Sequence, residues 1–223
     1  MKKMKALEDI DPYLQGCRLD HSIWLHSFHQ LDPQQMEWVR TWRNHPHIRQ
    51  WLYNQEWISE EEHARFFQQL RHDKHRFYWM VGEGERWLGV INLQIDSAVG
   101  TEWGFHLNPD CLGKGLDLLY IGLQFFLEEL KIPQLHGWVD YRNTNALLLH
   151  DFFGIRHSRY EKRQLKGVTR CFSLRSISTQ QWQGQKDRRQ WQRELLSQKA
   201  SLKRYREQII AEQKRLECHW NFQ

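Results

Sequence analysis

The segment from Leu107 to Leu116 reads LNPDCLGKGL and places two glycines beside a lysine. Apolar alternation before it predicts a strand that ends near Leu107, and the apolar residues after it predict a helix. Gly113 and Gly115 would let the backbone approach a ligand closely. The unpaired amides and the dipole of a helix N-terminus favour a negative charge. The segment is therefore a candidate phosphate-binding turn, although an ordinary helix N-terminus also explains a pair of glycines.

The two common nucleotide-binding motifs do not fit this turn. A P-loop requires Ser or Thr after its lysine, whereas Lys114 is followed by Gly115 and Leu116. A dinucleotide-binding fold requires a third glycine at the position where Leu118 stands. Any phosphate ligand of this turn therefore belongs to another class.

A second segment, Val139–Ile155, reads VDYRNTNALLLHDFFGI and predicts a strand followed by a short helix. Together the two segments resemble the motifs VxPxxRGxG and VxxxNxxAxxLYxxxGF of the GNAT family of acetyl-CoA-dependent N-acetyltransferases. The matching residues are Leu107, Pro109, Gly113 and Gly115 in the first motif, and Val139, Asn143, Ala146, Leu149 and Gly154 in the second. Both motifs occur in the family's order and at a fitting distance.

This resemblance implies acetyl-CoA as the co-substrate. No metal is expected, because the histidines, such as His47 and His63, have no supporting carboxylate or thiolate ligands. The cofactor-binding residues that it implies are Leu107, Asn108, Leu112, Gly113, Lys114, Gly115, Leu116 and Asn143. Asn143 would bind the pantetheine arm or simply cap the helix, and both roles can coexist. Four residues depart from the family pattern. Leu112 replaces a basic or Gln-type residue, and Ile155 replaces a Phe. His150 replaces a Tyr that often protonates the departing thiolate, and His106 replaces another Tyr.

The N-terminal half narrows the resemblance within the family. The stretch WRNHPHIRQWL at 42–52, the pattern ISxxEH at 58–63, and the segments at 88–91 and 102–109 are similar to the N-acetyltransferases of pseudaminic acid biosynthesis. Those enzymes acetylate the 4-amino group of UDP-4-amino-4,6-dideoxy-N-acetyl-β-L-altrosamine. GNAT enzymes that acetylate ribosomal-protein N-termini share the same helix end. A nucleotide-sugar acceptor, a peptide acceptor and a non-catalytic acyl-CoA-binding module therefore stay open as alternatives.

The reaction, attack of a neutral amine on a thioester, requires a group that accepts the amine proton. Glu102 and His106 alternate onto one face of the predicted strand and form a candidate pair. His150 is a candidate proton donor, because histidine titrates near neutral pH. A solvated carboxylate and a core histidine are the structural alternatives for Glu102 and His150.

The resemblance implies that the acceptor binds at the link between the first two helices. A diphosphate would pair with arginine, and a uracil ring would stack on an aromatic side chain. The candidate acceptor-binding residues are Arg43, His45, Arg49, Trp51 and Tyr53. Each of them is also an ordinary core or surface residue when taken alone.

The elements that must position these residues alternate in a mixed order. We expect strands at 17–28, 77–81, 87–95, 100–107, 135–141, 155–164 and 169–176. We expect helices from Asp32-Pro33, from the capping box at Ser59–Glu62, over 113–130 and over 143–153. Consecutive hairpin strands exclude a purely parallel sheet. The expected fold is thus α/β, the GNAT fold, with a mixed, mostly antiparallel seven-stranded sheet flanked by helices.

The predicted domain organisation is an extension at 1–16, a GNAT domain at 17–178 and an amphipathic C-terminal helix at 179–223. Leu195, Leu202, Ile209 and Leu216 recur every seven residues along that helix. The helix would fold back on its own domain, form a homodimeric coiled coil, or present a basic face.

Composition excludes several classes of protein. The 223 residues include 40% hydrophobic and 26% charged residues, which is ordinary globular usage. A net charge of +5 suits an anionic ligand and does not require nucleic acid as a partner. The four cysteines form no CxxC pair, so a zinc ribbon is excluded. With no apolar run long enough to span a membrane and no visible signal peptide, we expect a soluble, cytoplasmic protein.

Overall fold

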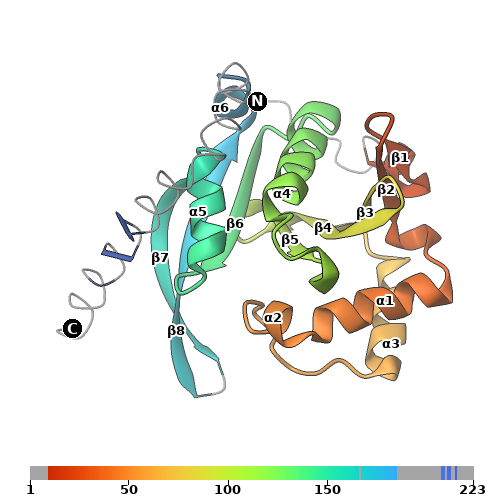
Figure 1. The fold of residues 1–223 in the computed structure, drawn as a ribbon, viewed down its shortest axis with the longest axis horizontal. Helices are drawn as coiled ribbons and strands as arrows, with labels where there is room; N and C mark the ends of the chain where they lie inside the picture. Colours follow the sequence, from red (N-terminus) through yellow and green to blue (C-terminus); the bar gives the residue numbers. More distant parts are fainter. Residues whose placement is uncertain (1–9, 166, 185–206, 209, 212–213, 215–223) are drawn as a thin grey trace. The chain divides into compact units, whose positions relative to one another are not determined.

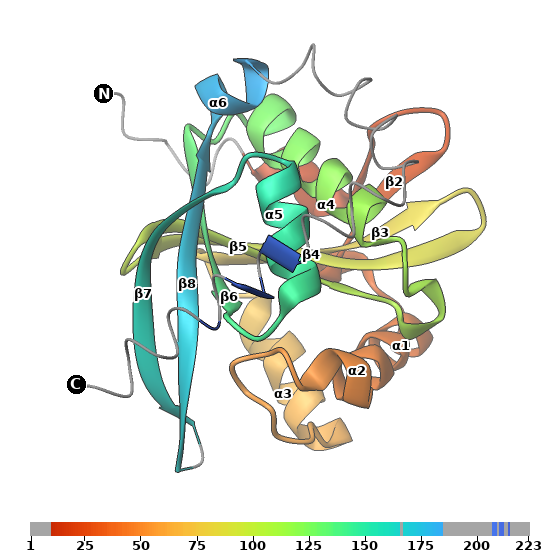
Figure 2. The ribbon, with the colours of Figure 1, turned by 60° about the vertical axis from the view of Figure 1, so that its left-hand side comes forward.

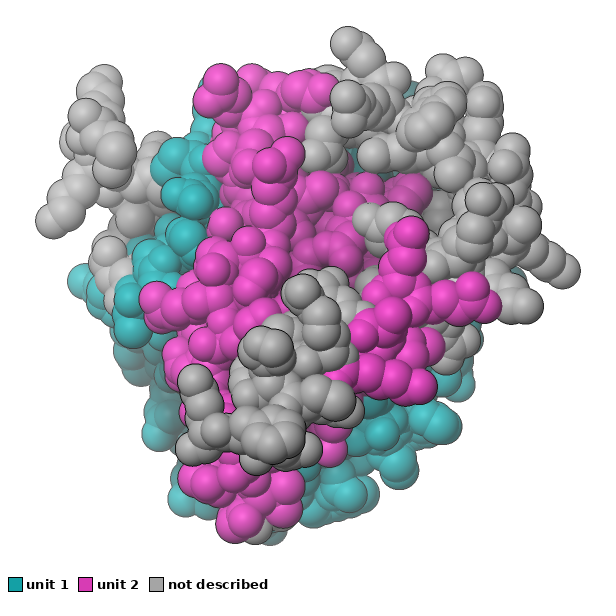
Figure 3. All heavy atoms as spheres, turned by 90° about the vertical axis from the view of Figure 1, so that its left-hand side faces the viewer, with its two compact units in different colours: residues 1–136 teal, residues 137–223 magenta. Residues whose placement is uncertain are grey.

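The structure, a computed structural model, describes residues 10–165, 167–184, 207–208, 210–211 and 214. The chain divides into two compact units, residues 1–136 (unit 1) and 137–223 (unit 2), which Figure 3 shows in teal and magenta. Each unit is described by itself below. The predicted boundaries at 16–17 and 178–179 stay a prediction.

Unit 1 holds an antiparallel sheet, helices on both of its faces and the start of a sixth strand. Its elements are η1 (Asp11–Gln15), β1 (Cys17–Arg18), β2 (Ile23–Ser27), η2 (Phe28–Gln30), α1 (Pro33–Asn44), α2 (Pro46–Arg49), α3 (Glu60–Leu70), β3 (Arg76–Glu83), β4 (Arg86–Ser97), β5 (Gly100–Leu107), η3 (Pro109–Cys111), α4 (Gly115–Gln124), η4 (Phe125–Glu129) and the first residues of β6 (Gln134–Asp140). The first five strands pair in chain order, each antiparallel to the next. β6 is parallel to β5, with Glu102 opposite His136.

The described residues form eight strands rather than the seven expected. The difference arises at Asp20, which interrupts the strand predicted at 17–28. Its carboxylate accepts hydrogen bonds from the backbone amides of Ser22 and Ile23, both at 2.7 Å. These bonds make a turn between β1 and β2.

Capping boxes start both α1 and α3; the sequence predicts the one at Ser59–Glu62, whereas at Asp32 it predicts the cap alone. The amide of Gln35 donates to Asp32 at 2.8 Å, and its side chain accepts from the Asp32 amide at 3.0 Å. Ser59 and Glu62 make the same reciprocal pair at the start of α3. Both helices thus begin where the sequence predicts, since each cap satisfies amides that the first turn leaves open.

α1 and α3 cover one face of the β3–β5 sheet, and α4 covers the other, as Figure 1 shows. The first face carries a core of Phe28, Leu31, Val39, Trp42, Phe67, Leu70, Met80 and Val90. On the second face α4 approaches β4 closely. A Cβ on Gly89 would lie 2.9 Å from Leu118 Cδ2, and one on Gly122 would lie 3.4 Å from Ile91 Cγ2.

The helix predicted at 113–130 starts later and changes its winding before it ends. The α-helix runs from Gly115 to Gln124, and a π-helical turn follows over Phe125–Glu129. The wider turn seats buried Phe125 edge-on against Trp79, with ring centroids 5.0 Å apart. Aromatic packing here overrides a regular helix.

Unit 2 contains the rest of β6, α5 (Thr144–Phe152), β7 (Arg156–Leu165), β8 (Val168–Ser178) and α6 (Thr179–Gly184). β7 and β8 form a long antiparallel hairpin, which Figure 2 shows clearly. α5 packs Leu147 and Ala146 with Val139 of β6, Tyr141 directly after β6 and Tyr160 of β7. Of the predicted C-terminal helix, α6 and residues 207–208, 210–211 and 214 are helical. Its heptad leucines, and hence the coiled-coil and homodimer hypotheses, lie outside the described residues.

Candidate functional site

The predicted phosphate-binding turn leads from β5 into α4. Gly113 has φ +104°, a backbone conformation that favours glycine, and open space surrounds the position of its missing Cβ. Lys114 precedes the first helical residue, Gly115, and no side chain caps the helix. Leu112 is 53% exposed. The turn therefore leaves a helix N-terminus uncapped beside a glycine, which suits a phosphate or pyrophosphate group.

Asn108 and Lys114 have structural partners within this turn. The Asn108 side chain donates to the Trp87 carbonyl at 2.9 Å and accepts from the Asp110 amide at 3.0 Å. Lys114 Nζ lies 3.0 Å from Asp117 and 3.6 Å from Glu83, and these carboxylates raise the pKa of the lysine. Asn108 thus anchors the turn to β4, and Lys114 offsets the carboxylate charge in the first turn of α4.

Glu102 and His106 share one face of β5, as their alternation predicts. Glu102 lies opposite Gln94 of β4, and His106 lies opposite Val90. Val90 belongs to the core beneath α1 and α3, so both side chains project from the α1/α3 face of the sheet. Residues of that face between them include Asn92 of β4 and Tyr78 of β3, which lie directly opposite each other.

His106 is held neutral by its surroundings. Burial and, to a smaller extent, the charge of Arg43 lower its pKa to about 4, against the opposing effect of a hydrogen bond to the Leu107 carbonyl. That bond joins Nδ1 to the carbonyl oxygen at 3.4 Å. Because a carbonyl oxygen can only accept, the contact assigns the proton to Nδ1 and leaves Nε2 as a hydrogen-bond acceptor.

Arg43, at the end of α1, is a partly buried cation whose bonding capacity is only partly used. One terminal nitrogen, Nη2, donates to the Asn54 carbonyl. The other, Nη1, is buried and has no hydrogen-bond partner among the described residues. Burial and the charge of Arg49 lower the pKa of Arg43 to about 10, so it stays protonated at neutral pH. An unsatisfied guanidinium nitrogen beside a second arginine is suited to an anionic ligand.

The segment between α1 and α3 presents the other predicted acceptor residues. Arg49 lies over the ring of Trp57, 5.8 Å from its centroid, and Trp57 is 61% exposed. Tyr53 is 36% exposed, and Trp51 is partly buried. His45 caps α2 by accepting from the His47 amide at 3.3 Å. Exposed aromatic faces and cations thus lie together on one short segment.

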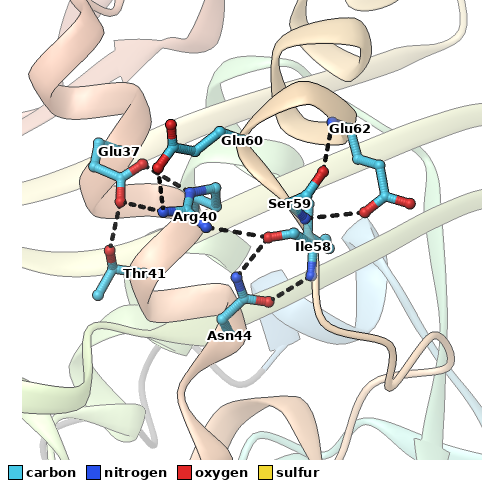
Figure 4. A network of polar contacts seen from close by, with 8 residues as sticks. All are labelled: Glu37, Arg40, Thr41, Asn44, Ile58, Ser59, Glu60 and Glu62. Atoms are coloured by element: carbon cyan, nitrogen blue, oxygen red, sulfur yellow. Dashed lines mark hydrogen bonds and ion pairs between the residues drawn. The ribbon is translucent and has the colours of Figure 1, made fainter.

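A polar network fixes both ends of this segment, and Figure 4 shows its parts. Asn44 is 2% exposed, and its amide group points at the backbone of Ile58. It donates to the Ile58 carbonyl and accepts from the Ile58 amide, each at 2.9 Å. Arg40 donates to the same carbonyl at 3.2 Å and is held by Glu37 at 2.6 Å. This role of Asn44 was not predicted from the sequence, because a reciprocal side-chain clamp across the segment leaves no spacing signal.

Asn143 and His150 lie in unit 2. The Asn143 side chain accepts from the Ala146 amide at 3.2 Å, so it caps α5, and binding to pantetheine stays a prediction. His150 is 3% exposed, and burial together with the charge of Arg175 lowers its pKa to about 3. His150 is therefore neutral near pH 7, and its role as a proton donor stays a prediction.

Within the described part of the chain, no three His, Cys, Asp or Glu side chains converge in a way that could hold a metal ion. No described helix has the length and apolar character needed to cross a membrane.

Residues 23–154 match the family described as the acetyltransferase (GNAT) domain. The acetyltransferase PseH of Campylobacter jejuni subsp. jejuni serotype O:23/36 (strain 81-176) is 33% identical over 128 residues, 57% of this chain and 81% of that protein.

Two crystal structures have a similar fold. That of C. jejuni N-acetyltransferase PseH in complex with acetyl coenzyme A has a TM-score of 0.55 at 25% identity, over 70% of this chain and 98% of that one. That of Vibrio cholerae spermidine N-acetyltransferase with CoA and spermine has a TM-score of 0.64 at 15% identity, over 74% of this chain and 99% of that one. The chain belongs to the GNAT family and is an acetyl-CoA-dependent N-acetyltransferase.

Proposed function

We propose that this enzyme acetylates the 4-amino group of a UDP-linked amino sugar, UDP-4-amino-4,6-dideoxy-N-acetyl-β-L-altrosamine, by direct transfer within a ternary complex. The buried Nη1 of Arg43, with no hydrogen-bond partner among the described residues, is the observation that carries the acceptor class. A diphosphate would satisfy this nitrogen by a charge-assisted hydrogen bond. The 33% identity to PseH and the motif resemblance support the same class of acceptor.

The segment after Arg43 supplies what the rest of a UDP-sugar requires. Arg49 adds a second positive charge for the diphosphate, and the exposed rings of Trp57 and Tyr53 offer stacking surfaces for uracil. Trp51 and His45 flank these residues. A polyamine or a basic peptide would need carboxylates instead, because both are cationic.

For acetyl-CoA we propose the turn from Leu107 to Leu116. The positive φ of Gly113 and the uncapped start of α4 at Gly115 suit the pyrophosphate. Asn108 and Lys114 shape the turn through their structural bonds, and exposed Leu112 borders it. Asn143 is the proposed partner of the pantetheine arm.

The chemistry follows from the charges on the α1/α3 face of the sheet. As the amine nitrogen attacks the thioester carbon, a C–N bond forms, the nitrogen becomes positive, and the C–S bond then breaks. The negative charge of Glu102 stabilises the positive nitrogen, and Glu102 accepts its proton through a water molecule. Neutral His106 orients the amine through Nε2, because burial and the charge of Arg43 disfavour a protonated imidazole there. The proposed role of His150 is to donate a hydrogen bond from its neutral ring to the departing thiolate. The thiolate takes its proton from solvent, and Glu102 returns the amine proton to solvent.

The test is CoA release from acetyl-CoA with three acceptors in parallel: the UDP-amino sugar, a basic peptide and spermidine. We expect release with the nucleotide sugar alone. In Arg43→Ala the KM for the sugar should rise about 10- to 100-fold at unchanged KM for acetyl-CoA, since a hydrogen bond to a charged group contributes about 1.5–3 kcal/mol.

Arg65→Ala is the matched control for Arg43→Ala, because it removes the same charge from the exposed surface of α3. Release with the peptide or spermidine alone would refute the proposed acceptor, and an equal effect of both variants would reduce Arg43 to a general electrostatic role.

A further inference from the structure

The centre of the α1/α3 face carries an amide side chain to which no role has yet been given. Asn92 lies in the middle of β4, opposite Tyr78 of β3 and opposite Gly104 of β5. Glu102 and His106 are the residues on either side of Gly104 that share its face. Asn92 therefore lies in the row between the two predicted catalytic residues.

The glycine at position 104 leaves the room that the Asn92 side chain takes. A Cβ at this position would lie 2.8 Å from Asn92 Oδ1, 3.5 Å from Nδ2 and 3.6 Å from Cγ. The amide group of Asn92 thus extends across the backbone of Gly104, toward the strand that carries Glu102 and His106. Any larger residue at 104 would displace it.

The Asn92 amide is also available to a ligand. Asn92 is only partly buried, and its side chain makes no hydrogen bond with another described residue. An amide has both donors and an acceptor, whereas Glu102 offers acceptors and neutral His106 offers an acceptor at Nε2. Asn92 therefore adds an amide donor between the acceptors of Glu102 and His106.

A negative charge and a positive charge both act on the residues of this row. The negative charge of Glu102 contributes to the raised pKa of Tyr78, after burial, and the charge of Arg43 reaches His106. Tyr78 is directly opposite Asn92. The row thus spans the space between a negative group and a positive group, which suits a polar, uncharged part of an acceptor.

We propose that Asn92 is an acceptor-binding residue that hydrogen-bonds a polar group next to the reacting amine, and that Gly104 is required because it leaves room for that contact. The class of group is a hydroxyl or an acetamido group, each of which offers an oxygen to the Asn92 NH₂. This inference rests on the proposed function, since it assumes that the α1/α3 face binds the acceptor.

The experiment measures the steady-state kinetics of Asn92→Ala, Gly104→Ala and the double variant with the UDP-amino sugar and acetyl-CoA. Asn92→Ala should lower kcat/KM for the acceptor about tenfold, the effect of one hydrogen bond, with the KM for acetyl-CoA unchanged. Gly104→Ala should reproduce that loss by displacing the amide. The double variant should be no worse than Asn92→Ala alone, because the methyl group then has no amide to displace.

Thr101→Ala is the matched control, a truncation on β5 whose side chain projects from the opposite face. Asn92→Asp, which keeps the shape but loses the donor, should match Asn92→Ala and covers the case in which the alanine variant fails to fold. Effects of Asn92→Ala and Gly104→Ala that multiply, or wild-type acceptor kinetics in Asn92→Asp, would overturn the proposal. Wild-type enzyme that acetylates no sugar would instead refute the proposed function.

Discussion

Arg43 and His106 are electrostatically coupled on the α1/α3 face of unit 1, although they come from a helix end and a strand far apart in the sequence. Burial is the first cause of the low pKa of His106, about 4, and the positive charge of Arg43 adds to it. A protonated imidazole beside a guanidinium that itself is partly buried would be strongly disfavoured. His106 therefore stays neutral, with Nε2 as a hydrogen-bond acceptor, at every pH near 7.

The pH dependence of the reaction tests this coupling. Since the pKa of His106 lies near 4, the residue does not titrate between about pH 6 and 9. His106→Gln, whose side-chain oxygen also accepts a hydrogen bond, should lower kcat/KM for the acceptor but leave the midpoint of the pH profile unchanged. A limb with an apparent pKa of about 6 to 7 that disappears in His106→Gln would show instead that His106 is the base.

The stability of unit 1 should depend on the Asn44 clamp. Asn44→Ala removes both hydrogen bonds to the Ile58 backbone, and at about 1 kcal/mol each the free energy of unfolding should fall by about 2 kcal/mol. Asn44→Asp can still accept from the Ile58 amide, but it buries a carboxylate and sets one of its oxygens against the Ile58 carbonyl, so it should lose at least as much. Urea unfolding measures both.

Thr41→Ala is the control for the clamp, because it removes an exposed contact with Glu37 in the same network. Loss of the clamp should also raise the KM for the acceptor, because the clamp joins the two ends of the segment that carries Arg49 and Trp57. An Asn44→Ala variant with wild-type stability and a wild-type KM for the acceptor would contradict this role.

Local signals made most of the fold predictable. The cap at Asp32, the capping box at Ser59 and the alternating strands were placed within a few residues, because each depends on neighbours in the sequence. The break at Asp20 and the π-helical turn after Gln124 were missed, because a side-chain turn and the packing of Phe125 on Trp79 decide them. Neither leaves a periodic pattern in the sequence.

The candidate site divides in the same way. Glu102 and His106 share a face as their spacing predicts, since alternation along one strand suffices for that inference. Asn92 and Tyr78 join them only through strand register, which a single sequence does not specify. The neutral state of His150 could not be foreseen either, because it follows from burial beside Arg175.

The buried His150 makes acid stability a measurable property of the enzyme. Its pKa is about 3 in the folded chain against 6.5 as the ordinary value, so below pH 6.5 the unfolded state binds more protons. The stability that this neutral side chain provides is complete above pH 6.5 and is lost as the pH falls toward 3. At about pH 5 the loss should be about 2 kcal/mol.

His150→Leu should remove this part of the pH dependence. Urea unfolding of wild type and variant at about pH 7 and about pH 5 measures it, and the variant should lose less stability between the two values. An identical pH dependence would show that His150 is accessible to protons in the folded protein. The KM of the variant for acetyl-CoA and its kcat test the proposed assistance to the thiolate separately.

Gly113 provides the sharpest test of the cofactor turn. Its φ of +104° is a conformation that a side chain disfavours, while no neighbouring atom lies within 4 Å of the position that an added Cβ would take. Gly113→Ala therefore changes the backbone rather than filling space, and at about 1–2 kcal/mol of strain the turn should shift. We expect the KM for acetyl-CoA to rise about tenfold, while the KM for the acceptor stays near that of the wild type.

Gly84→Ala is a matched control, because Gly84 has φ +60° and equally open surroundings in the β3–β4 turn. Its cost should appear in thermal stability alone. Equal kinetics in both variants would mean that the turn at Gly113 does not bind the co-substrate.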